Sequence, residues 1–107
     1  MKPLENLSDQ EKEQLLRYLG KIYRRGTQYV RTGWHFGDLA QDKDADMEVA
    51  AKIRMILRSM DHDGALILYH DFFEIRAADW WNRKYSACAY AKYRKSAMNQ
   101  LLSLLYQ

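Results

Sequence analysis

Two His-Asp dipeptides, His62-Asp63 and His70-Asp71, lie eight residues apart in this chain. Imidazole and carboxylate groups are common ligands of catalytic metal ions. A metal site would need further ligands from other helices, and His35 is the only other histidine. Neighbouring residues on a helix also point about 100° apart, so a dipeptide does not easily aim both groups inward. We therefore expect no bound metal, and a metal-dependent phosphohydrolase is a distant third hypothesis.

Cys88 is the only cysteine of the chain and a second candidate for chemistry, as a nucleophile. Such a cysteine needs a histidine partner and a third group that orients it, and the sequence signals neither. Loops that bind phosphate are rich in glycine, but no glycine follows Gly64. We therefore expect neither an enzyme nor a cofactor. A single cysteine cannot form an internal disulfide, which fits a reducing cytoplasm.

The basic residues are concentrated in the last third of the chain. From Glu74 onward there are six basic residues and two acidic ones, which gives a local charge of +4. The whole chain carries +3, so residues 1–73 carry −1. A cationic patch on a nearly neutral body suits binding to a phosphate backbone. The alternative is an ordinary solvated lysine-rich face, which many small proteins have.

The composition predicts the elements that must position these residues. The chain has 107 residues, 48% of them hydrophobic, with one proline and five glycines. This favours a single all-α domain over residues 1–107, folded as a compact bundle of about five helices. There is no run of about 18 apolar residues, and the N-terminus lacks the apolar core of a signal peptide. We expect a cytoplasmic protein without a membrane partner.

The first three helices are predicted from capping and periodicity. Ser8 and Glu11 form a capping box that opens the first helix, and Gly26 is a plausible stop or kink. The second helix is predicted over Asp44–Met60, with acidic residues in its first turn. The third helix, over Ala65–Phe73, is apolar on most sides and should be central. Between the first two helices we expect a loop with the aromatic residues Trp34, His35 and Phe36.

The C-terminal part has the layout of a helix-turn-helix. A short helix is predicted over Ala77–Arg83, and Trp80 within it is expected in the core, while the direction of its neighbour is left open. A turn follows, in which Tyr85 would be the apolar plug between two helices. Ser86 is then the predicted N-cap of a long final helix.

The final helix has an apolar face and a basic face. At spacings of three and four, the apolar stripe consists of Tyr90, Tyr93, Ala97, Leu101, Leu104 and Leu105. The opposite face is cationic and mostly small-chained, as expected of a helix that lies in the major groove of DNA. Phosphate contacts would supply most of the affinity. The predicted DNA-binding residues are Arg83, Lys84, Ser86, Cys88, Lys92, Lys95 and Asn99.

Four short motifs lie within Ile53–Leu102: IRMILRSM before a break, ALILYHDFFE as a tightly packed helix, YS at the turn, and YAKYRKSAM, which contains Ala97. In these motifs the chain resembles the region-four domain of sigma factors and related phage transcriptional regulators of the ArpU and RinA type. The resemblance implies a DNA-binding helix-turn-helix, here over residues 65–106, and a role in gene activation. It carries the recognition role onto Ser86, Cys88, Lys92 and Lys95. The turn has Lys84 where a glycine is common.

These features together predict a DNA-binding transcriptional regulator of a bacterium or its phage. Its partner would be double-stranded DNA, with RNA polymerase or a second copy of the chain as a further partner. The alternative is a helical protein–protein adaptor that does not bind nucleic acid. An adaptor would use the tyrosine-rich face of the last helix and Leu101–Tyr106 as its partner surface, because tyrosine is frequent in interfaces.

Overall fold

The computed structural model describes residues 6–32 and 43–106, which form helices and turns without a strand. The all-α prediction is therefore confirmed for this part of the chain. The helical elements, in chain order, are α1 (Asp9–Thr32), α2 (Lys43–Ser59), α3 (His62–Leu68), the π-helical segment η3 (Tyr69–Phe73) and α4 (Ala87–Leu105). The predicted loop residues Trp34, His35 and Phe36 lie outside the described residues.

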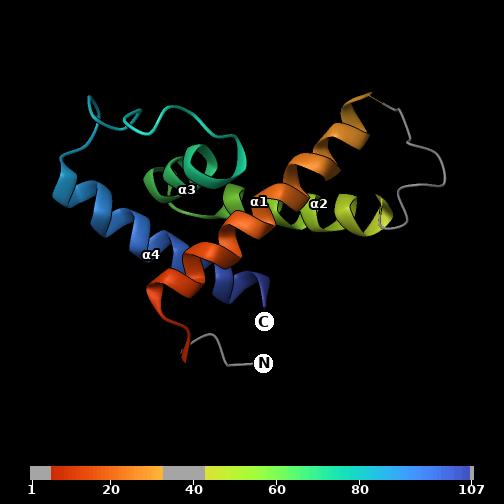
Figure 1. The fold of residues 1–107 in the computed structure, drawn as a ribbon, viewed down its shortest axis with the longest axis horizontal. Helices are drawn as coiled ribbons and strands as arrows, with labels where there is room; N and C mark the ends of the chain where they lie inside the picture. Colours follow the sequence, from red (N-terminus) through yellow and green to blue (C-terminus); the bar gives the residue numbers. More distant parts are fainter. Residues whose placement is uncertain (1–5, 33–42, 107) are drawn as a thin grey trace.

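The long helix α1 is the element around which the others are arranged. It packs against α2, η3 and α4, and α3 packs against α4 (Figure 1). Because η3 continues α3 without a break, the two form one helical rod, in which η3 contacts α1 and α3 contacts α4. The first turns of α4 lie at the end of the molecule away from α2 (Figure 1).

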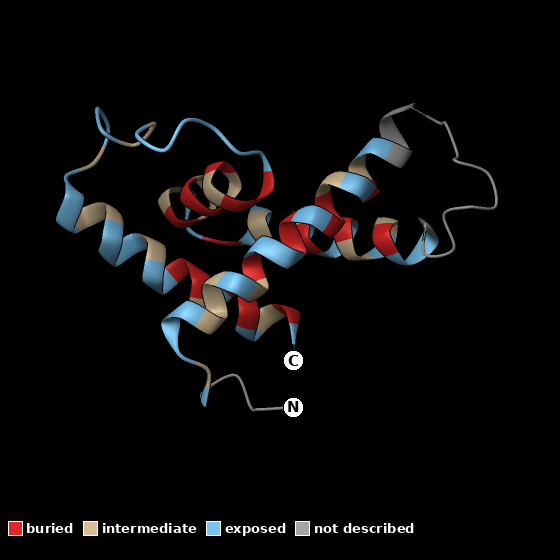
Figure 2. Ribbon diagram, viewed as in Figure 1, coloured by how far each residue is buried: buried red, intermediate tan, exposed pale blue. Residues whose placement is uncertain are grey.

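The core lies where these elements meet, and it draws side chains from all of them. Buried residues gather at the centre of the ribbon, while residues 74–79 and the first turns of α4 are mostly exposed (Figure 2). Burial of one such side chain stabilises the fold by about 1.5–3 kcal/mol. The largest fully buried side chains are Phe72, Phe73, Leu16, Ile53, Ile67, Leu68, Leu101 and Leu102.

The predicted capping box at the start of α1 is confirmed. The backbone N–H of Glu11 donates to Oγ of Ser8 at 3.1 Å, and the backbone N–H of Ser8 donates to Oε1 of Glu11 at 3.0 Å. These two bonds satisfy N–H groups that have no partner within the helix itself. The start of α1 is thereby fixed by local sequence alone.

The prediction that Gly26 stops the first helix is wrong, because α1 continues past it to Thr32. A Cβ atom at Gly26 would lie 2.4 Å from the backbone oxygen of Asp46 in α2. The glycine is therefore needed for the close approach of two helices rather than for a turn. Arg25, next to it, forms an ion pair with the same Asp46 at 3.2 Å.

A second close approach brings α1 against η3. A Cβ atom at Gly20 would lie 2.0 Å from the backbone oxygen of Phe72. One turn further along α1, the guanidinium of Arg24 donates to the carbonyl oxygens of Phe72 at 2.8 Å and Phe73 at 3.2 Å. Carbonyls at the end of a helix lack partners within it. Arg24 therefore caps the end of η3 from the neighbouring helix.

The apolar stripe of α4 is confirmed in its C-terminal half and corrected in its N-terminal half. Ala97, Leu101 and Leu105 are buried and Leu104 packs against the core, whereas the side chain of Tyr93 is 39% exposed. Of the partner surface that an adaptor would use, the leucines Leu101, Leu102 and Leu105 therefore lie in the core, whereas Tyr93 and Tyr106 are exposed. Where α4 crosses α3, a Cβ atom at Gly64 would lie 3.0 Å from Cβ of Ala97, so small residues set the distance between these helices.

The helix predicted over Ala77–Arg83 is not formed. Residues 74–86, here called the connector, run through successive turns with backbone bonds such as Trp80 N–H to Ala77 O and Asn82 N–H to Asp79 O, both at 3.0 Å. Adjacent residues on a helix point about 100° apart, so one of two neighbouring rings would face solvent. In the turns, Trp80 and Trp81 both contact protein. The expected fifth helix is therefore absent from the described residues.

Candidate nucleic-acid interface

The two tryptophans hold the connector against the rest of the molecule. The indole N–H of Trp80 donates to Oδ1 of Asp71 at 2.8 Å, and its ring packs edge-on against His70 with centroids 4.8 Å apart. The ring of Trp81 stacks on Tyr90 of α4 at 4.4 Å, with 11° between the planes. Both indoles are half-buried, so the prediction of Trp80 as a core residue is only partly right. The connector is thus a fixed, turn-rich structure.

The start of α4 is fixed by the predicted cap at Ser86 and by a tyrosine that contacts α3. Oγ of Ser86 accepts a hydrogen bond from the backbone N–H of Ala89 at 3.1 Å. The hydroxyl of Tyr85 donates to Oδ1 of Asp63 in α3 at 2.5 Å, and its ring packs edge-on against Tyr93. Burial and the bond to Asp63 raise the pKa of Tyr85 to about 12. Tyr85 is therefore the plug between α3 and α4.

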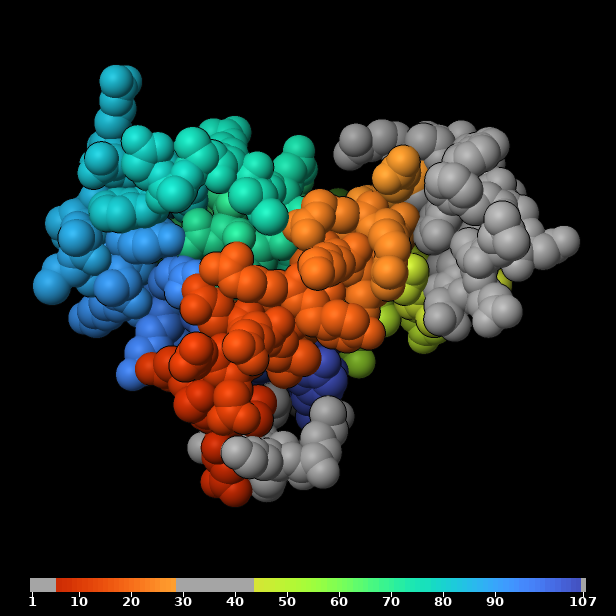
Figure 3. Space-filling model, in the orientation of Figure 1, coloured from red at the N-terminus to blue at the C-terminus, as the bar shows by residue number. Residues whose placement is uncertain are grey.

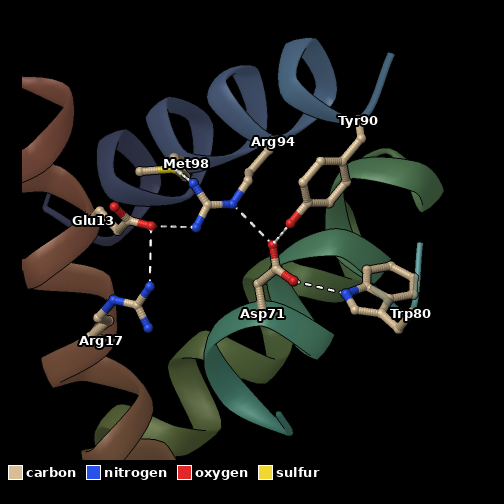
Figure 4. A network of polar contacts seen from close by, with 7 residues as sticks. All are labelled: Glu13, Arg17, Asp71, Trp80, Tyr90, Arg94 and Met98. Atoms are coloured by element: carbon tan, nitrogen blue, oxygen red, sulfur yellow. Dashed lines mark hydrogen bonds and ion pairs between the residues drawn. The ribbon is translucent and has the colours of Figure 1, made fainter. Parts of the chain in front are cut away.

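Behind this end of α4 lies a network of polar contacts centred on the carboxylate of Asp71 (Figure 4). Besides Trp80, Asp71 accepts hydrogen bonds from the hydroxyl of Tyr90 and from Nε of Arg94 at 2.9 Å. Burial and the bond to Asp71 raise the pKa of Tyr90 to about 12. One carboxylate thus joins the connector, η3 and α4.

Arg94 extends this network to α1. Its Nη2 donates to Oε1 of Glu13 at 2.6 Å, and the same oxygen accepts from Arg17 at 3.2 Å. The hydrogen bond from Arg94 is the main reason why the pKa of Glu13 is lowered. Burial alone would lower the pKa of Arg94. The hydrogen bonds of Arg94 to Glu13 and Asp71 have a larger combined effect, so its pKa is raised. The guanidinium also lies over the ring of Phe72, 4.9 Å from its centroid.

Of the seven predicted DNA-binding residues, four remain exposed with free side-chain groups in the described part of the chain. They lie on the end of the connector and the first two turns of α4. These segments cover one end of the molecule in the space-filling view (Figure 3). Ser86 is also exposed, but its hydroxyl serves the cap described above. The four residues are Arg83, Lys84, Cys88 and Lys92.

The other two predicted residues, Lys95 and Asn99, are engaged by the first turns of α1. Nζ of Lys95 lies 3.4 Å from Oδ2 of Asp9, with about two-thirds of each side chain exposed (68% and 66%). Oδ1 of Asn99 accepts a hydrogen bond from Nζ of Lys12 at 2.8 Å. The basic edge of α4 is therefore open at its N-terminal end and partly covered by α1 beyond Lys92.

A cleft of about 430 Å³ separates the start of α1 from the middle of α4. Its charged residues are paired with one another across it, as Asp9 with Lys95 and Glu13 with Arg94. Its lining residues are Asp9, Gln10, Lys12, Glu13, Tyr90, Ala91, Arg94, Lys95, Met98 and Asn99.

Three of the four residues of the two His-Asp dipeptides are used in packing or hydrogen bonding. His62 is exposed and Asp63 accepts from Tyr85, whereas His70 is buried and Asp71 is the hub of the network. Within residues 6–32 and 43–106, no three His, Cys, Asp or Glu side chains are grouped so that they could hold a metal ion.

Sequence reasoning missed Arg94 and its partners. Arg94 is one of the six basic residues from Glu74 onward, yet it lies between Tyr90 and Ala97 at spacings of four and three, within the apolar stripe. A charged residue in that place signals a buried partner, because an unpaired charge would not be stable there. The identity of that partner, Asp71, follows from the fold alone.

No protein-family model matches this chain, and no curated protein or solved structure matches it either. In the described residues, no helix has the length and apolar character needed to cross a membrane. The geometry and charge of the site are therefore the grounds on which a function is assigned.

Proposed function

We propose that this chain binds double-stranded DNA through the end of the connector and the first turns of α4. In this proposal the start of α4 enters the major groove, and Arg83 and Lys84 contact phosphates beside it. Lys92 reaches from the second turn of α4 toward the groove. Most of the affinity comes from phosphate contacts, because few of these side chains can read base edges.

The observation that supports this proposal most is the distribution of unpaired cations. Arg83, Lys84 and Lys92 are exposed and have no carboxylate partner among the described residues. Arg94 and Lys95, by contrast, are paired with carboxylates. Arg83, Lys84 and Lys92 thus form a group of unpaired cations at one end of the molecule, where the Asp71 network holds the start of α4 in place, while the exposed cations Lys21, Lys52 and Arg58 lie on α1 and α2.

If the chain binds DNA in the manner of a helix-turn-helix protein, α4 is the helix that enters the groove and the rod of α3 and η3 supports it. The connector then stands where a short helix was expected before the turn. The resemblance to region four of sigma factors and to phage regulators supports a role in transcription. RNA polymerase or a second copy of the chain would then be a further partner. The adaptor alternative is less well supported, because Leu101, Leu102 and Leu105 are used in the core.

The salt dependence of binding to a fluorescent duplex tests the proposal. Each phosphate contact lowers the logarithm of the binding constant by about 0.9 per decade of salt, so three contacts give a slope of about −3. We expect binding to a duplex with this steep dependence. A chain that does not bind duplex DNA even at low salt would overturn the proposal.

A charge-matched pair of triple variants locates the contact. In the first variant Arg83, Lys84 and Lys92 are replaced by glutamine, and the slope should fall by about 3 with most of the affinity lost. In the control, three exposed cations of α1 and α2 are replaced instead: Lys21, Lys52 and Arg58. Both variants have the same net charge, so equal losses of affinity would contradict an interface at α4.

A further inference from the structure

The connector rests on a histidine that is almost completely buried. The side chain of His70, in η3, is 8% exposed. Its ring packs edge-on against Trp80 of the connector at 4.8 Å and against Tyr69 at 5.4 Å. Its backbone oxygen accepts a hydrogen bond from the backbone N–H of Arg76 at 3.1 Å. His70 therefore holds the first part of the connector through both its ring and its main chain.

One nitrogen of this ring has no partner. Nδ1 of His70 is buried, and no described residue forms a hydrogen bond with it. A neutral imidazole can leave this atom as an unused acceptor. Protonation would place an N–H there without an acceptor and a positive charge on a buried ring, and both changes are unfavourable. The packed arrangement thus requires the neutral ring.

Some of the charged groups near the ring lower the pKa of His70 and others raise it. Burial has the largest effect and lowers the pKa of His70 below its ordinary value of 6.5, and the positive charge of Arg76 in the connector lowers it further. The backbone and carboxylate of Glu74, also in the connector, and the carboxylate of Asp71 in η3 act in the opposite sense but do not outweigh burial. Asp71 already accepts hydrogen bonds from Trp80, Tyr90 and Arg94, and none from the ring of His70.

We propose that His70 is an acid-sensitive latch that holds the connector closed while its ring is neutral and releases Trp80 when the ring is protonated. The sign follows from linkage. A histidine whose pKa is lower in the closed state favours closure above 6.5, and closure is lost as the pH falls below that value. Each pH unit below 6.5 multiplies the ratio of open to closed connector by up to about ten. This proposal does not depend on the proposed DNA binding, because the opening of the connector is a property of the protein without DNA.

The indole N–H of Trp80 reports the latch directly in the full chain. Its NMR signal, assigned with a Trp80→Phe variant, should lose protection from solvent exchange as the pH falls from 7.5 to 5. The variant His70→Gln, whose side chain is neutral throughout, should remove this pH dependence. The control His62→Gln replaces an exposed histidine eight residues away and should keep it. If His70→Gln retains the same dependence, or His62→Gln abolishes it, the latch is wrong.

The titration of the His70 ring in the unmodified protein provides a second measurement, which does not depend on how a variant folds. The ring carbon signal should titrate with a midpoint below 6.5, and over the same pH range as the change at Trp80. A midpoint at or above 6.5, or a ring that titrates while the indole N–H stays protected, overturns the proposal.

Discussion

Asp71 and Arg94 are joined by an ion pair in which Nε of Arg94 donates to Oδ2 of Asp71 at 2.9 Å. Both side chains are largely buried, with 11% of Asp71 and 23% of Arg94 exposed. This pair links η3 to α4, and the second ion pair of Arg94, with Glu13, links α4 to α1. The proposed DNA-binding end of α4 lies just beyond it along the helix. The direction in which that end points is therefore fixed by polar contacts as well as by the core.

Replacing Arg94 with methionine should destabilise the protein strongly. The substitution keeps much of the packing but leaves the carboxylates of Asp71 and Glu13 without their main partner. Removal of one member of a buried pair costs about 3–5 kcal/mol, and the partial exposure of Arg94 places our expectation near 3 kcal/mol. Urea denaturation measures the loss. The control Arg17→Met removes the more exposed partner of Glu13 and should cost about 1 kcal/mol or less. Equal losses in the two variants would show that Arg94 has no special role.

Replacing Gly20 with alanine should also destabilise the fold, although alanine is the better helix former by about 1 kcal/mol. The added Cβ would lie 2.0 Å from the backbone oxygen of Phe72, so α1 and η3 would have to move apart. Overpacking of this kind costs about 1–3 kcal/mol. In a domain of this size the melting temperature should fall by about 4 °C or more. Lys21→Ala, at the neighbouring exposed position, should change it little. A Gly20→Ala variant as stable as the parent would argue against this close approach.

Tyr85 and Tyr90 should keep their protons in alkaline solution. Their pKa values are raised from 10.0 to about 12, mainly by burial and then by hydrogen bonds to Asp63 and Asp71. Because the raised pKa belongs to the folded state, the stability from these phenols is present below pH 10 and is lost as the pH rises toward 12. NMR of chains labelled at the tyrosine Cζ atom should show both rings protonated at pH 11. Ionisation of either ring near pH 10 in the folded protein would contradict the expectation.

Removal of the cap at the start of α4 should loosen its first turn. Ser86→Ala deletes the oxygen that accepts from the backbone N–H of Ala89, which costs about 1 kcal/mol. Amide hydrogen exchange at the first turn of α4 should become faster, and Ser86→Thr should restore protection. Ser96→Ala changes an exposed serine within the same helix and serves as the control. Unchanged exchange in Ser86→Ala would mean that the cap contributes nothing to this end.

Features that depend on short-range rules could be predicted from the sequence. The capping box of Ser8 and Glu11 and the cap at Ser86 are bonds between residues three apart, so the residue types are enough to identify them. The burial of Leu101 and Leu105 follows from helical spacing in the same way. Tyr85 was predicted to lie between the helix over Ala77–Arg83 and the last helix, but its hydroxyl binds Asp63, so it lies between α3 and α4 instead.

Features that depend on a distant partner could not be predicted. Gly26 suggested a helix end, but it is required by the backbone of α2, which no local pattern reveals. The stretch around Trp80 suggested a helix, but contacts to Asp71 and His70 favour turns that bring both tryptophans onto the protein. Among the candidate site residues, Lys95 and Asn99 were predicted to face DNA. Their contacts with α1 join residues more than eighty positions apart in the sequence.

The crossing of Gly64 and Ala97 gives α4 a pivot. From Ala97 to Cys88 the helix extends about 14 Å beyond the crossing, at 1.5 Å per residue. A methyl group added at the crossing would wedge the two helices apart, and the far tip of α4 would swing through a larger arc than the pivot itself. The size of the residue at position 64 in α3 therefore sets the direction of the first turns of α4, which it does not contact.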